Sequence, residues 1–106
     1  MEHVMMDLET WGTTQGCAIR SIGAALFDLD EGVGETFYRN IQDRSCWLAG
    51  LRVEASTADW WSKQTKDAKD RLTRDQLPLK EVVRDFHNWF RDNGARFVWC
   101  QGGRLR

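Results

Sequence analysis

An apolar stripe in the second half of the chain constrains the fold more than any other sequence feature. Between Pro78 and Asn93, large apolar side chains recur at three- and four-residue spacing, as in a helix that buries one face. Pro78 suits the first helical position, and the pair Asn93-Gly94 suits a helix C-terminus. The stripe comprises Leu79, Val82, Val83, Phe86, Trp89 and Phe90. Such a face must be buried against another layer, which the remaining chain has to supply.

Short apolar segments predict that this layer is a β-sheet. The expected strands cover His3–Leu8, Ala18–Leu29, Val33–Ile41 and Arg96–Cys100. The turn sequence Asp-Leu-Asp-Glu-Gly separates the second segment from the third, so the two segments predict an antiparallel hairpin. The last segment follows a helix, so we expect it to lie beside the first strand and parallel to it. The pattern predicts an α/β fold with a mixed β-sheet: an N-terminal antiparallel hairpin, then helices and a parallel strand.

The region between the hairpin and the stripe gives weaker signals. Gln42–Ala55 has no regular pattern, whereas Thr57–Leu72 predicts a helix that Ser56 would cap in a sequence resembling a capping box. In that helix, the neighbours Trp60 and Trp61 point about 100° apart, so only one of them can pack inward. We expect core packing rather than a nucleic-acid stacking platform for these tryptophans.

Composition excludes several classes of protein. The 106 residues are 42% hydrophobic and 29% charged, which excludes a disordered or collagen-like chain and fits a single domain. Lysine and arginine total 15 against 16 acids, so a strongly basic nucleic-acid binder is disfavoured, although a local basic face is not. We find no signal peptide and no apolar run of the ~20 residues that a membrane helix needs, and we expect a cytoplasmic protein. The odd number of cysteines, 3, predicts reduced thiols without a disulfide framework.

Two carboxylates stand at the end of the first predicted strand. Asp7 and Glu9 are two residues apart, so they share one face of the strand. Two adjacent acids repel each other unless a cation lies between them, and carboxylate oxygens suit Mg²⁺ or Mn²⁺. A pair of acids that is merely solvated is the alternative. The spacing by itself does not separate the two.

The sequence around this pair resembles the DEDD (DnaQ-like, RNase H-like) 3′–5′ exonucleases, and more narrowly the phage and prophage 3′–5′ exoribonuclease or exonuclease VIII-like group. The resemblance extends from His3 to about Gln101. The matching segments are Met5–Thr13, Ala18–Asp28, Gly34–Ile41, Ala55–Gln64 and Pro78–Val82. The resemblance implies an RNase H-like sheet and hydrolysis of phosphodiester bonds at the 3′ end of RNA or single-stranded DNA.

By this resemblance, Asp7 and Glu9 are catalytic residues that ligate a pair of divalent ions, Mg²⁺ or Mn²⁺. Thr10 and Trp11 would then lie beside the 3′-terminal nucleotide, and Trp11 could stack on a base. A lid over the hairpin is an equally good interpretation of Trp11. Trp89 and Trp99 are expected in the core.

The family also needs a second acidic motif after the last predicted strand, which this sequence does not contain. We therefore expect residues 1–101 to be the N-terminal part of an RNase H-like exonuclease domain, incomplete at the C-terminus, and residues 102–106 to be an aberrant tail. For one choice of codons, reading Gly-Gly-Arg-Leu-Arg one base later gives Ala-Asp-Phe followed by an acid. A frameshift is therefore our hypothesis for this tail.

A truncated domain is expected to be weak or inactive alone, since it lacks metal ligands and a general base. We also expect an uncovered sheet face around Ile22 and Val98, and an open sheet edge through which the chain could form a homo-oligomer. The alternative function is that of a non-catalytic remnant, which binds a partner or nucleic acid.

Overall fold

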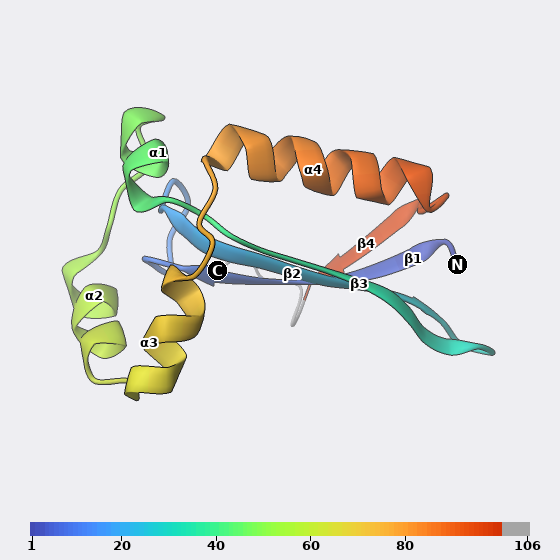
Figure 1. Cartoon of the computed structure of the whole chain (residues 1–106), viewed down its shortest axis with the longest axis horizontal. Coiled ribbons are helices and arrows are strands. Elements are labelled where there is room, and N and C mark those ends of the chain that lie inside the picture. Colours follow the sequence, from blue (N-terminus) through green and yellow to red (C-terminus); the bar gives the residue numbers. More distant parts are fainter. Residues whose placement is uncertain (101–106) are drawn as a thin grey trace.

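A four-stranded mixed sheet forms the centre of the computed structural model, which describes residues 1–100 (Figure 1). Its strands are β1 (His3–Thr10), β2 (Ile19–Asp28), β3 (Gly32–Asn40) and β4 (Phe97–Cys100). Their order is β3-β2-β1-β4, with β1 antiparallel to β2 and parallel to β4. The predicted α/β class, the hairpin and the place of the last strand are confirmed, and the arrangement is compatible with an RNase H-like fold. The predicted aberrant tail, 102–106, lies outside the described residues.

Four helices lie between the third and fourth strands. They are α1 (Asp43–Leu48), α2 (Ala55–Ser62), α3 (Lys66–Thr73) and α4 (Leu79–Asp92). The prediction of irregular structure at Gln42–Ala55 is wrong for α1, because six residues are too few to show a helical period. The single helix predicted over Thr57–Leu72 is wrong too. The first helix ends at Ser62. Thr65 then caps a second helix by accepting a hydrogen bond from the Ala68 amide at 3.2 Å.

The start of α2 also differs from the prediction. Its N-cap is Glu54 rather than Ser56, and the Glu54 side chain makes no bond to the helix. That carboxylate instead accepts hydrogen bonds from the Thr13 amide, at 2.5 Å, and from the Thr14 hydroxyl, at 3.1 Å. These bonds lower the pKa of Glu54, because they favour its charged form. Glu54 thus fastens the loop between β1 and β2 to the start of α2.

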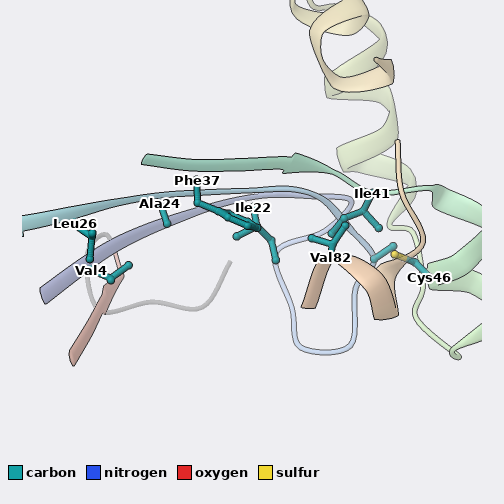
Figure 2. Close-up of a cluster of buried hydrophobic side chains, with 9 residues drawn as sticks. Val4, Ile22, Ala24, Leu26, Phe37, Ile41, Cys46 and Val82 are labelled. Carbon is teal, nitrogen blue, oxygen red and sulfur yellow. The ribbon is translucent and has the colours of Figure 1, made fainter. Parts of the chain in front are cut away.

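The core lies between α4 and one face of the sheet (Figure 2). The stripe predicted from the sequence forms α4, and Val82 in its first turn is fully buried. Val83 is half-exposed because it points away from this face, so the predicted stripe is one residue too wide. The buried cluster consists of Val4, Ala18, Ile22, Ala24, Leu26, Phe37, Ile41, Cys46 and Val82. Ile22 is only 5% exposed, so the expectation that the sheet is uncovered around it is wrong.

The opposite face of β1 and its neighbours is the open one. Within residues 1–100, no helix covers the part of this face near the N-terminus (Figure 1). The ring of His3 stacks on Phe97 with centroids 5.2 Å apart, and the Trp99 indole donates a hydrogen bond to His3 Nδ1 at 3.1 Å. Trp99 is 52% exposed, so its predicted place in the core is wrong. β4 is an edge strand of the described sheet, so the backbone on its outer side has no neighbouring strand to pair with there.

Both ends of the segment that carries α1, α2 and α3 meet at one point. Ile41 and Leu77 form a parallel bridge, and the amide of Leu77 donates to the carbonyl of Asn40 at 2.9 Å. The amide of Gln42 donates in turn to the carbonyl of Leu77 at 2.8 Å. The segment is therefore a closed excursion from the end of β3.

Two further predictions concern thiols and membranes. The cysteines Cys17, Cys46 and Cys100 are free, as predicted, and the first two are buried. Over residues 1–100, the helices lack the length and apolar character needed to cross a bilayer.

Candidate catalytic site at the end of the first strand

Asp7 and Glu9 lie on the open face of the sheet, where β1 approaches its end. The alternation of side chains along β1 turns both acids away from α4, while Leu8 between them packs against the core. Asp7 is exposed and pairs with Gly23 on β2, and Glu9 is half-buried and pairs with Ser21. Gly23 has no side chain, and a Cβ built there would lie 3.6 Å from the ring of Tyr38. The structure thus brings the two predicted carboxylates together on one accessible surface.

The charge on Glu9 is disfavoured by its surroundings. Burial raises the pKa of Glu9, and the neighbouring carboxylate of Asp7 raises it further. The guanidinium groups of Arg71 and Arg20 act in the opposite direction, with Arg71 the stronger. A cation between the two acids would remove their repulsion and keep Glu9 ionised. The electrostatics therefore suit a positively charged ligand.

Arg20 is the site residue that the sequence analysis missed. Its side chain is only 6% exposed, and its guanidinium lies 4.2 Å from the centre of the Trp11 ring and 4.8 Å from that of Trp61. Burial lowers the pKa of Arg20, whereas attraction to Asp43 and Glu9 raises it. The available signal was an arginine at the start of an otherwise apolar strand, which must find partners if it is buried.

Two tryptophans fix the backbone that follows the acids. The Trp11 indole donates to Asp43 Oδ1 at 2.8 Å, and the Trp61 indole donates to the carbonyl of Thr10 at 2.9 Å. The hydroxyl of Thr10 donates to the carbonyl of Gly12 at 2.6 Å. Thr10 and Trp11 are therefore held beside Glu9 by contacts from α1 and α2.

Of the two adjacent tryptophans on α2, one is buried and one is not. Trp61 is 7% exposed and Trp60 is 55% exposed. This confirms the prediction that only one of them packs inward.

The end of α3 is tied to the same face of the sheet. Asn40 on β3 pairs with Ser21, which pairs in turn with Glu9. The Asn40 side-chain amide donates to the carbonyls of Arg71, at 2.7 Å, and Arg74, at 2.8 Å. Because neighbouring strands are about 4.8 Å apart, Asn40 lies roughly 10 Å from the strand that carries the acids, and it ties the end of α3 to this side of the sheet.

The donor set fits a hard divalent cation. Carboxylate oxygens from one or two residues are enough for Mg²⁺, which completes its coordination with water and substrate phosphate. In the part of the chain that the structure describes, no group of three or more His, Cys, Asp or Glu side chains could hold a metal. Asp7 and Glu9 therefore suit Mg²⁺ or Mn²⁺, whose remaining ligands would be water and substrate phosphate.

Comparison with known families supports a nuclease. A family model described as the 3′-5′ exoribonuclease Rv2179c-like domain matches residues 2–105. The comparison with curated proteins gave no match. The family match covers the acid pair, the loop that follows it, and the helices α1, α2 and α3.

Proposed function

The chain belongs to the Rv2179c-like 3′–5′ exoribonuclease domain family, and on this basis we propose that it removes nucleotides from the 3′ end of RNA by metal-dependent hydrolysis at Asp7 and Glu9. The observation that carries this proposal is the juxtaposition of two carboxylates on an open sheet face, with arginines that favour the ionised form of Glu9. Single-stranded DNA is the alternative substrate.

Asp7 and Glu9 would hold Mg²⁺ or Mn²⁺, and a pair of such ions supplies an activated water and stabilises the departing 3′ oxygen. Arg71 and Arg20 partly offset the burial and the repulsion from Asp7 that disfavour the charged, ligating form of Glu9. Thr10 and Trp11 border the terminal nucleotide, where the bond from Trp11 to Asp43 fixes the orientation of the indole. This orientation reduces the entropy that the site must lose on binding.

The polarity and the metal dependence can be tested together. The chain is incubated with the same single-stranded RNA labelled at either its 3′ or its 5′ end, with Mg²⁺, with Mn²⁺ or with EDTA. We expect the 3′ label to leave at once as a mononucleotide, the 5′-labelled RNA to shorten stepwise, and EDTA to stop both. Activity that persists in EDTA, or release of the 5′ label first, would contradict the proposal. RNA binding without hydrolysis would favour the non-catalytic alternative.

We also propose that the chain self-associates through β4. Phe97, Val98 and Trp99 are about half-exposed on this edge strand of the described sheet, and such an edge can pair with a second copy. Val98→Lys should shift the molecule toward the monomer in size-exclusion chromatography with light scattering, because a charge on an edge strand opposes pairing. Val83→Lys, at a similarly exposed valine on α4, is the matched control. A wild-type chain that stays monomeric at all concentrations would refute the proposal.

A further inference from the structure

A polar groove runs along α3, outside the acid pair. Its volume is about 420 Å³, and it is open to solvent. The lining residues are Thr65, Asp67, Ala68, Arg71 and Arg74. Two arginines against one acid give the groove a net positive charge. This is the reverse of the charge around Asp7 and Glu9.

The two arginines are available to a ligand. Both are exposed, and among the ion pairs of the described chain neither one has a carboxylate partner. Their backbone is nevertheless fixed, because the Asn40 amide donates to both of their carbonyl oxygens. Exposed arginine side chains on a rigid backbone suit the recognition of an anion, since the guanidinium fork binds phosphate oxygens in a bidentate manner.

The groove lies beside the candidate catalytic site, and Arg71 links the two. Arg71 lines the groove and also attracts the carboxylate of Glu9. Across the sheet, Glu9, Ser21 and Asn40 are aligned in register on β1, β2 and β3. Ser21 and Asn40 are themselves buried, so a strand of nucleic acid with its 3′ end at the acids would reach the groove by passing over the exposed side chain of Arg71.

We propose that Arg71 and Arg74 bind the phosphates of the RNA strand on the 5′ side of the nucleotide to be removed. This proposal rests on the proposed function, which places the 3′ end at Asp7 and Glu9. The groove holds the backbone rather than the bases, because its charged side chains match phosphates and its lining includes no aromatic ring. Arg71 and Arg74 thereby position the substrate and offset the repulsion between phosphates and the acid pair.

The test measures binding without hydrolysis. A fluorescent single-stranded RNA is titrated with the chain in EDTA, and its anisotropy is followed from about 50 to 200 mM salt. For the double variant Arg71→Gln/Arg74→Gln, we expect affinity to fall about tenfold at low salt. The slope of log K against log salt should decrease in magnitude by about 0.7 for each lost phosphate contact, or about 1.4 for both. The matched control is Lys80→Gln/Arg84→Gln, which removes two charges from exposed positions on α4 and should leave the slope unchanged.

The outcomes separate the groove from the reaction. An RNA that binds the double variant with unchanged affinity and slope overturns the assignment of the groove, even if the wild type hydrolyses RNA. A slope that depends on Arg71 and Arg74 in a chain without hydrolysis supports the groove and contradicts the proposed reaction. A wild-type chain that does not bind RNA overturns both. Arg71→Lys/Arg74→Lys should restore most of the slope, because the charge is kept.

Discussion

Asp7→Asn is expected to reduce metal-dependent hydrolysis of 3′-labelled RNA by about 10³-fold or more, which corresponds to roughly 4 kcal/mol of barrier. The substitution keeps the shape of the side chain and removes the charge that a divalent cation needs. Asp7 is exposed and its side chain has no hydrogen-bond partner in the described structure, so the free energy of unfolding should change by no more than about 0.5 kcal/mol. The kcat and the urea midpoint of the variant are to be measured together.

A second readout of Asp7→Asn is independent of catalysis. Repulsion from Asp7 contributes to the raised pKa of Glu9, so the pKa of Glu9 should fall when Asp7 is neutralised. An NMR titration of the Glu9 carboxyl in the metal-free chain measures this shift. In the wild type, Mn²⁺ should broaden the amide signals around Asp7, Glu9 and Gly23, and the variant should lose this effect.

Asp30→Asn is the matched control, because Asp30 is an exposed acid in the turn between β2 and β3, far along the chain from the site. It should leave hydrolysis, the pKa of Glu9 and Mn²⁺ broadening unchanged. Full hydrolytic activity in Asp7→Asn, with the same dependence on metal, would remove Asp7 from the proposed site.

Arg20→Met is expected to lower the free energy of unfolding by about 2 kcal/mol or more, and Tm by roughly 10 °C. The guanidinium lies between the rings of Trp11 and Trp61, and each cation–π contact is worth up to about 2 kcal/mol when it is desolvated. Methionine fills part of the volume but removes a positive charge that attracts Asp43 and Glu9. Urea denaturation at pH 7 measures the change.

Further variants show which property of Arg20, its charge or its planar group, stabilises the fold. Arg20→Lys keeps the charge and loses the planar group, so its stability should be intermediate. In Arg20→Met, the pKa of Glu9 should rise further, because one of its two attracting cations is gone. Arg44→Met, at an exposed arginine on α1, is the control and should cost little. A urea midpoint for Arg20→Met equal to that of the wild type would show that the two ring contacts contribute nothing.

The elements that the sequence predicts well are those whose signals are local. The stripe on α4, the turn of the hairpin and the alternation in β1 are each encoded within a few neighbouring residues, and α4 begins and ends within one residue of the prediction. The same local alternation puts Asp7 and Glu9 on one face, and the structure agrees. Their role as metal ligands stays a prediction.

The surroundings of the acids could not be predicted, because they depend on contacts between distant parts of the chain. Trp61 reaches the carbonyl of Thr10 across 51 positions, and Asn40 reaches that of Arg71 across 31. The break between α2 and α3 was hidden in a sequence that continues a helical pattern, and only the Thr65 cap marks it. Such pairings follow from the tertiary fold rather than from propensity.

The bridge between Ile41 and Leu77 closes off the segment that carries α1, α2 and α3 from the sheet and α4. Since the excursion from β3 leaves and returns at one place, insertions or deletions within it need not disturb the strand order or the packing of α4. Loop closure costs only slightly more free energy as such an excursion lengthens. A chain of this fold could therefore change in length and charge between these two residues while β1, which carries Asp7 and Glu9, keeps its place in the sheet.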